Sequence, residues 1–136
     1  MANKDDNQVT NIPLCGVDIE QAATFPKTED YVEHQFYRDH FTRDEIDYCS
    51  AQFEPRLHFA VRWCAKEAVR KCLPALMNID NTKLEVRKRH DGAPFLVIQT
   101  STGTRDLPVS LSLSHSGGMA IAMVTAHPSS LTSMLL

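Results

Sequence analysis

The sequence predicts an α+β domain in which a largely antiparallel sheet packs against one long helix. Before residue 80, apolar side chains recur three or four residues apart, which is the spacing of one helix face. After residue 80, apolar and polar residues alternate, and His90-Asp91-Gly92 and Gly117-Gly118 mark tight turns between the alternating segments. Helices followed by hairpins, with little strand–helix–strand alternation, favour an α+β fold over a parallel α/β fold.

The first half of the chain contains one short strand and three helices. An apolar run over 13–19 predicts a buried strand, and helical spacing predicts a helix over 29–41. The T-R-D-E segment at 42–45 matches a capping box, so a second helix follows to about residue 50. The longest helix covers about 55–76, because a proline suits its first position and a second proline falls in its last turn.

The second half contains four strands. Alternation predicts strands over 84–87, 95–98, 109–114 and 119–126, and the polar segment 100–106 is expected to be a loop. Together these elements make one domain over residues 12–127, between a disordered lead (1–11) and a flexible tail (128–136).

Composition excludes several classes of protein. The 136 residues carry a net charge of −3, which argues against a general nucleic-acid-binding protein. No apolar run approaches the ~18–20 residues of a membrane span, and the polar N-terminus is unlike a secretion signal, so we expect a cytoplasmic protein. The four cysteines form no C-x-x-C pair and are expected to be reduced and mostly buried. The charge is uneven: residues 1–55 hold 12 acidic and 4 basic side chains, and residues 56–136 hold 5 and 10.

The first motif with chemical potential is Gly16-Val17-Asp18-Ile19-Glu20. In a strand, Asp18 and Glu20 point to the same side, where their carboxylates repel each other. A hard cation such as Mg²⁺ would remove that repulsion, because it prefers oxygen ligands. The alternative is a strand end that faces solvent, where two acids need no partner.

The second motif is the helical segment from Trp63 to Lys71. Trp63, Glu67 and Lys71 are each four residues apart and share a stripe. Glu67 and Lys71 are either an ordinary surface ion pair or a third metal carboxylate with a cation one turn away.

The third motif is the segment 112–118, which contains Ser114 and His115. Hydroxyls, an imidazole and free backbone N–H groups at a strand end suit a phosphate, although a solvated serine-rich turn has the same composition. A Ser–His hydrolase is a poor alternative, because neighbouring side chains in a strand point to opposite sides and no G-x-S-x-G elbow is present.

In combination and in this order, the motifs resemble the 4′-phosphopantetheinyl transferases. The signature of that family is a G-[VI]-D strand followed after about 40–45 residues by W/F-x-x-K-E-A/S-x-x-K. The chain has Gly16-Val17-Asp18, then 44 residues, then Trp63-Cys64-Ala65-Lys66-Glu67-Ala68-Val69-Arg70-Lys71. Three further segments resemble the family: Phe41-Thr42 with Glu45, Gly92-Ala93-Pro94, and Ser114-His115-Ser116-Gly117. The resemblance covers roughly residues 14–126, and the short chain points to the small holo-[acyl-carrier-protein] synthase type.

The resemblance implies a fold, an activity and a site. The family fold is an antiparallel sheet on one long helix, and the reaction moves 4′-phosphopantetheine from coenzyme A to a carrier-protein serine, leaving 3′,5′-ADP. The roles it implies are Mg²⁺ ligands (Mn²⁺ being an alternative ion) at Asp18, Glu20 and Glu67, catalytic groups at Glu67 and Lys71, and coenzyme A contacts at Lys66, Ser114 and His115.

The resemblance also implies partners. These are coenzyme A, an acidic acyl carrier protein, and two further copies of the chain in a homotrimer, with the turn around His115 facing Asp18 and Glu67 of the neighbouring subunit. Two departures concern partner contacts: the first basic residue after Asp18 is Lys27, and Ala93 stands where larger members often carry a cation. Two other functions stay open, namely a non-catalytic carrier-binding module of the same fold and another divalent-metal phosphohydrolase.

Overall fold

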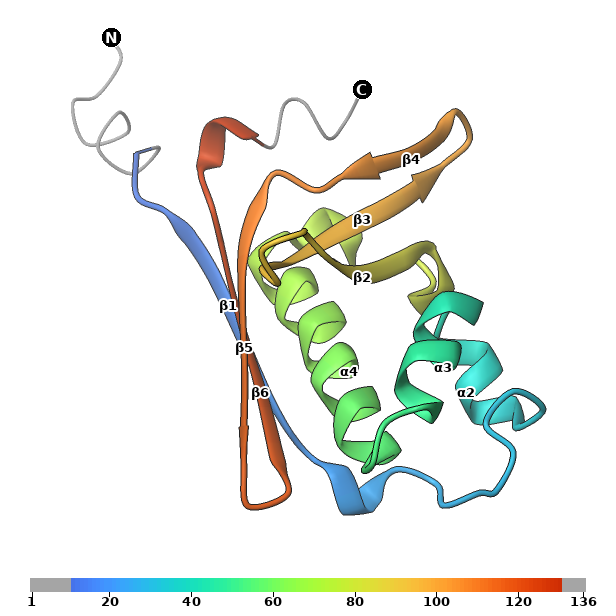
Figure 1. Ribbon diagram of the computed structural model, residues 1–136. Coiled ribbons are helices and arrows are strands. Elements are labelled where there is room, and N and C mark those ends of the chain that lie inside the picture. The colour runs from blue at the N-terminus through green and yellow to red at the C-terminus, as the bar shows by residue number, and fades with distance from the viewer. Residues whose placement is uncertain (1–10, 131–136) are drawn as a thin grey trace, which may run out of the picture.

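Two three-stranded antiparallel sheets and one long helix organise the protein (Figure 1). The structure is a computed structural model that describes residues 11–130. Sheet A has the strand order β1-β6-β5, and sheet B has the order β2-β3-β4. The strands are β1 (Leu14–Gln21), β2 (Leu84–Lys88), β3 (Pro94–Thr100), β4 (Gly103–Asp106), β5 (Val109–Ser116) and β6 (Met119–Ala126).

Helix α4 (Pro55–Cys72) packs against β1 and β6 of sheet A. In Figure 1 the shorter helices α2 (Gln35–His40) and α3 (Arg43–Ser50) lie on the other side of α4, and sheet B lies near its C-terminal end. Single 3₁₀ turns complete the chain at η1 (Ala22–Thr24), η2 (Pro74–Leu76), η3 (Asn81–Lys83) and η4 (Pro128–Ser130). The predicted α+β class with antiparallel strands on one long helix is confirmed.

The strands divide into two sheets, whereas one was expected. The segment 103–106, expected to be a loop, forms β4 against β3. All four of its residues are exposed, so β4 lacks the alternation that reveals a half-buried strand. Leu107 still donates its N–H to Leu96 O at 2.8 Å. Pro108 has no N–H to continue this pairing, and the chain passes there into β5 of sheet A.

Two helices are shorter than predicted. The helix expected over 29–41 is confined to α2, because residues before it form side-chain-capped turns: Asp30 Oδ1 accepts the Glu33 N–H at 3.2 Å, and His34 Nδ1 accepts the Phe36 N–H at 3.3 Å. The long helix ends at Cys72 instead of continuing to residue 76, because Pro74 starts the separate turn η2.

The predicted lead and tail fall largely outside the described residues. Residues 1–10 and 131–136 are not described, and the first described part of the tail forms η4. All four cysteines are free thiols, and three of them are buried, as predicted. Within residues 11–130, no helix has the length and apolar character needed to cross a membrane.

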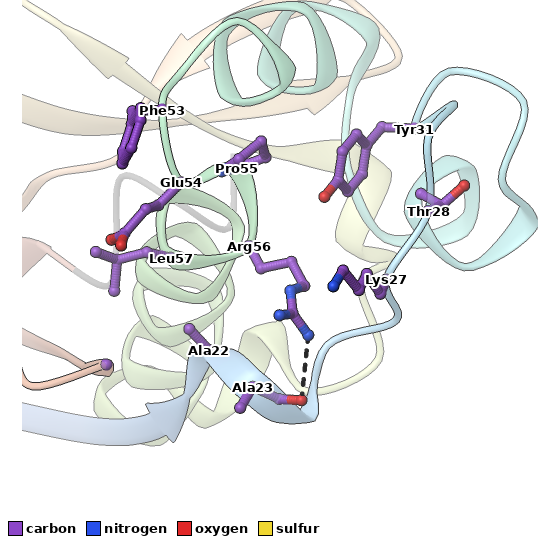
Figure 2. A pocket seen from close by; sticks show the side chains of 11 residues that line it. Ala22, Ala23, Lys27, Thr28, Tyr31, Phe53, Glu54, Pro55, Arg56 and Leu57 are labelled. Atoms are coloured by element: carbon purple, nitrogen blue, oxygen red, sulfur yellow. Dashed lines mark hydrogen bonds between the residues drawn. The ribbon is translucent and has the colours of Figure 1, made fainter.

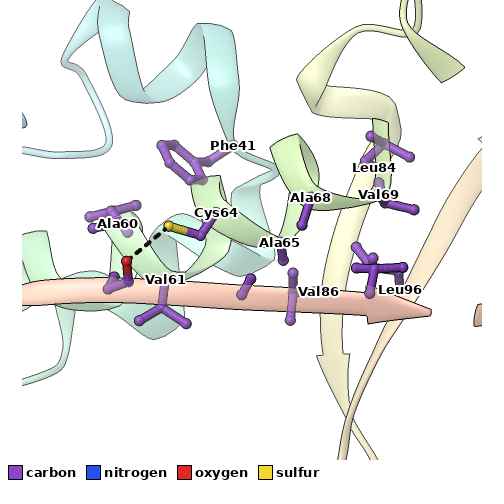
Figure 3. Packing of buried hydrophobic residues seen from close by; sticks show 14 of the residues in the cluster. Phe41, Ala60, Val61, Cys64, Ala65, Ala68, Val69, Leu84, Val86 and Leu96 are labelled. Carbon is purple, nitrogen blue, oxygen red and sulfur yellow. Dashed lines mark hydrogen bonds between the residues drawn. The ribbon is translucent and has the colours of Figure 1, made fainter. Parts of the chain in front are cut away.

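The core lies between sheet A and α4, where small side chains let the two elements approach closely (Figure 3). Ala60 and Ala68 of α4 and Ala120 and Ala122 of β6 are fully buried. Gly16 makes the closest approach: a Cβ added to it would lie 2.1 Å from the Ala68 carbonyl oxygen. This contact presses β1 against the last turns of α4 and so carries the strand's acidic residues to that end of the helix.

Candidate functional site

Asp18 and Glu20 lie on the side of β1 that faces α4. Their cross-strand partners are Ala122 and Ala120, and both alanines are buried in the core. Residues opposite each other in an antiparallel ladder point to the same side, so both carboxylates point inward. The side chain of Asp18 is only 11% exposed. The two predicted carboxylates therefore lie at the edge of the interface between sheet A and α4.

Glu67 of α4 joins these carboxylates electrostatically. The pKa of Glu20 is raised, first by burial, then by the negative charges of Asp18 and Glu67, while Lys71 opposes the increase. Lys71 Nζ lies 3.1 Å from Asp18 Oδ1 and donates to Val17 O at 2.9 Å. The structure thus brings Lys71 against Asp18, which is 53 residues away in the sequence.

The carboxylate oxygens of the cluster are suitable ligands for a divalent ion, although the three acids do not converge on one point. Asp18 Oδ2 is buried and has no hydrogen-bond partner. Its loss of hydration is therefore not compensated by any protein group. Among residues 11–130, no three His, Cys, Asp or Glu side chains are close enough together to surround a metal ion. Ion pairs hold two of the acids: Asp18 contacts Lys71, and Glu67 Oε1 lies 3.5 Å from Arg70. Carboxylate oxygens with an orphaned Asp18 atom fit Mg²⁺ or Mn²⁺.

Lys66 does not belong to the accessible site, which corrects the expectation that it contacts coenzyme A. Its side chain is 1% exposed, and Nζ lies 2.7 Å from Glu45 Oε1, 2.9 Å from His40 O and 2.8 Å from Asn81 O. All three ammonium protons therefore have protein acceptors. The adjacent Glu67 lies about 100° further around the helix and reaches the surface instead.

An aromatic cluster that the sequence did not predict covers Trp63, the first residue of the Glu67 stripe. The Trp63 ring centroid is 5.8 Å from Phe25, 5.9 Å from Phe36 and 4.9 Å from His40. His40 Nδ1 is 2.8 Å from Asn81 Nδ2, and the His40 pKa is lowered, first by burial and also by Lys66 and Arg70. An imidazole whose charged form is disfavoured by burial therefore packs on the tryptophan near Glu67. Helical spacing indicated an apolar face here but could not indicate this pairing.

Ser114 and His115 lie at the end of β5 on opposite sides of sheet A. His115 pairs with Ala120, which pairs with Glu20, so His115 and Glu20 are on the same side with one strand between them. Ser114 pairs with Ile121 and lies on the outer side. The two residues that the sequence assigned to one phosphate therefore do not face the same direction within one chain.

His58 lies near Arg62, Lys88 and His115, a grouping of distant residues that the sequence does not reveal. The pKa of His58 is lowered, first by burial and then by the charges of Arg62, His115 and Lys88. Arg62 is buried, and its Nε has no hydrogen-bond partner. The Arg62 guanidinium lies 4.4 Å from the Tyr48 ring centroid, and Lys88 Nζ donates to the Tyr48 hydroxyl at 2.9 Å. These groups suit a phosphate, but they come from three elements that only the fold brings together.

The outer side of sheet A is an apolar surface. Val17 and Ile19 of β1 pair with Met123 and Ile121 of β6, and all four large side chains are exposed. A contiguous apolar patch on an otherwise polar protein typically marks a contact with another protein. Ser114 borders this patch.

A pocket of about 410 Å³ opens at the N-terminal end of α4 (Figure 2). Figure 2 shows the cationic ends of Lys27 and Arg56 close to each other, with Tyr31 on one side. Arg56 donates to Ala23 O at 3.4 Å, which fixes its guanidinium at the mouth of the pocket. The Phe53 side chain is 99% exposed at the edge. The pocket thus combines two cations and the carboxylate of Glu54 with an exposed aromatic ring at its edge.

Comparison with known proteins places this arrangement in a family. The sequence matches the model of the 4′-phosphopantetheinyl transferase superfamily over residues 14–124. It is 31% identical over 109 residues to a holo-[acyl-carrier-protein] synthase of Thermodesulfovibrio yellowstonii. The match covers 80% of this chain and 93% of that protein. It is 32% identical over 123 residues to fatty acid synthase subunit alpha of Schizosaccharomyces pombe, which covers 82% of this chain and 6% of that protein.

The fold is also that of solved relatives. The crystal structure of Helicobacter pylori holo-[acyl-carrier-protein] synthase in complex with coenzyme A aligns with a TM-score of 0.65 at 22% identity, over 82% of this chain and 97% of that chain. Signature motifs, fold and relatives agree, and the chain belongs to the 4′-phosphopantetheinyl transferase superfamily, among the enzymes of the holo-[acyl-carrier-protein] synthase family.

Proposed function

We propose that the protein transfers 4′-phosphopantetheine from coenzyme A to a serine hydroxyl of an apo acyl carrier protein. The serine oxygen forms a bond to the phosphorus of the phosphopantetheine group, and the bond from that phosphorus to 3′,5′-ADP breaks. The observation that carries the proposal is the group of Asp18, Glu20, Glu67 and Lys71 in a chain of this family. Phosphoryl transfer depends mainly on positioning and charge neutralisation, which such a group supplies.

The acidic residues are the proposed metal ligands. Asp18, Glu20 and Glu67 would hold Mg²⁺ or Mn²⁺, and a divalent ion bound there would supply Lewis-acid stabilisation of the diphosphate charge. Lys71 lies within 3.1 Å of Asp18 and more than half of its side chain is exposed, so it is free to neutralise charge on the leaving phosphate. The serine proton passes to a carboxylate or a water at the site.

The group of imidazoles and cations that includes His115 is the proposed contact for a terminal phosphate of coenzyme A. His58, Arg62 and Lys88 add to His115 there, whereas Lys66 is left out because its bonds are internal. The pocket of Lys27 and Arg56 with Phe53 at its edge is the proposed contact for an acidic carrier, because opposite charges steer encounter and an exposed aromatic ring anchors it. Fatty-acid and polyketide carriers both fit this description.

One assay tests the proposal against the two alternatives. The protein is incubated with coenzyme A, Mg²⁺ and an apo carrier, and the carrier is weighed by mass spectrometry. We expect a gain of one phosphopantetheine group, no gain with a Ser→Ala carrier, and loss of the gain with a chelator. Binding of the carrier without a mass gain would support the non-catalytic module, and release of phosphate from unrelated esters would support a phosphohydrolase.

A homotrimer with its sites between subunits is the proposed assembly. The apolar outer side of sheet A would be buried at the contact, where Ser114 also lies. If the turn around His115 serves the Asp18 of a neighbour, Asp18→Ala and His115→Ala proteins should each be inactive but should complement each other after mixing. Random mixing gives both intact halves at about one quarter of the contacts, so about one quarter of the activity should return. No recovery in trimers shown to be mixed would place the site within one chain.

A further inference from the structure

Arg70 is a buried cation whose counter-ion is the proposed metal ligand Glu67. Arg70 is only 7% exposed and lies in the last turn of α4. One guanidinium nitrogen donates to Ile79 O at 2.6 Å, and the other lies 3.5 Å from both Lys66 O and Glu67 Oε1. In the part of the chain that the structure describes, no other carboxylate lies within ion-pair distance of Arg70. A buried guanidinium without a counter-ion would be strongly destabilising, so this contact serves the fold as well as the site.

Glu67 lies between this cation and the two strand carboxylates. Its side chain is 35% exposed, its Oε1 faces Arg70, and its charge raises the pKa of Glu20. On the other side, Lys71 contacts Asp18. Two consecutive cations, Arg70 and Lys71, therefore stand beside the three acids, and the local charge is close to −1 instead of −3. A divalent ion is attracted much less strongly to a charge of about −1 than to a charge of about −3.

We propose that Arg70 is a positioning residue that holds the Glu67 carboxylate at the edge of the acidic cluster and offsets its charge, so that a divalent ion binds weakly alone and firmly together with a diphosphate. This inference rests on the proposed function. A diphosphate brings its own negative charge to the ion and restores the attraction that Arg70 removes. The contact of Arg70 with Ile79 O fixes the guanidinium, so the Glu67 carboxylate faces a fixed charge.

Direct binding of Mn²⁺, followed by electron paramagnetic resonance without carrier protein, tests the inference. In the wild-type protein, coenzyme A should tighten Mn²⁺ binding at least about tenfold. Arg70→Met removes the charge at similar length and should tighten Mn²⁺ binding about tenfold in the absence of coenzyme A. Arg70→Lys keeps the charge and should stay near the wild-type affinity. Arg87→Met removes an arginine of β2 that pairs with a different carboxylate, Glu85, and should leave Mn²⁺ affinity unchanged.

Each outcome decides the matter. If folded Arg70→Met binds Mn²⁺ no more tightly than the wild type, the inference is overturned. It is also overturned if Arg70→Lys tightens Mn²⁺ binding as much as Arg70→Met does. If Arg70→Met does not fold, Arg70→Gln replaces it with the same expected tightening, and equal Mn²⁺ affinity of the wild type with and without coenzyme A contradicts the inference in either case. If the wild-type protein modifies its carrier and Arg70→Met binds Mn²⁺ with wild-type affinity, the role of Arg70 is refuted and the proposed function is not. Absence of Mn²⁺ binding under every condition refutes the proposed metal site as well.

Discussion

Glu67→Ala is expected to lower kcat/KM for phosphopantetheine transfer by at least about a hundred- to a thousandfold without unfolding the protein. Glu67 is the acid that α4 contributes to the cluster, and its charge acts on Glu20 from the opposite side of the interface. Its side chain is partly exposed, and its removal leaves the core between sheet A and α4 intact. The loss should therefore appear in kcat of a folded protein, whose melting temperature falls because the buried Arg70 loses its counter-ion.

Three measurements make this expectation specific. Initial rates over a range of Mg²⁺ concentrations show whether excess metal restores the activity, and full recovery would contradict a metal-binding role for Glu67. Circular dichroism and a thermal melt verify the fold. Glu33→Ala is the matched control, because Glu33 is an exposed acid outside the cluster, and this variant should retain wild-type activity.

Glu45→Ala is expected to lower the free energy of unfolding by about 3–5 kcal/mol, because it leaves a buried charge without its counter-ion. Glu45 and Lys66 are each 1% exposed and form a 2.7 Å ion pair. Glu45 also accepts the N–H groups of Thr42 and Val86, each at 3.0 Å, and so ties α3 and β2 to α4. Burial lowers the pKa of Lys66, and the charge of Glu45 opposes that change.

Urea denaturation followed by circular dichroism measures the loss. The control is Arg43→Ala, which removes an exposed pair with Asp47 on the same helix at a similar distance of 2.8 Å and should cost less than about 0.5 kcal/mol. If the Glu45→Ala protein is as stable as the Arg43→Ala protein, the buried pair does not stabilise the packing of α3 and β2 against α4. The double variant Glu45→Leu with Lys66→Met should recover much of the stability, because it removes both charges together.

Much of the fold could be predicted because its signals are local. The periodicity of α4, the turns at Gly92 and Gly117, and the capping box of α3 each depend on residues within a few positions of one another. The capping box is present as predicted, with Thr42 Oγ1 accepting the Glu45 N–H and Glu45 accepting the Thr42 N–H. Strand β4 could not be predicted in this way, since none of its side chains is buried and its pairing with β3 leaves no pattern in the sequence.

The candidate site divides in the same way. The sequence by itself determined that Asp18 and Glu20 share one side of a strand and that Glu67 and Lys71 share one side of a helix, because each pair is set by the geometry of one element. Only the tertiary structure decided which cations of α4 are buried and which one reaches the acids of β1. Lys66 and Glu67 are neighbours in the signature, yet α3 and η3 enclose the first and β1 approaches the second.

The physical reason is that a helix presents successive residues about 100° apart, whereas burial depends on the elements that pack against each side. Arg70 and Lys71 show the same division: the first is buried against Ile79 and faces Glu67, and the second is exposed and faces Asp18. The sequence thus determined that β1 carries two acids and that α4 carries one acid among several cations. Their close packing, made possible by Gly16, decided which acid each cation contacts.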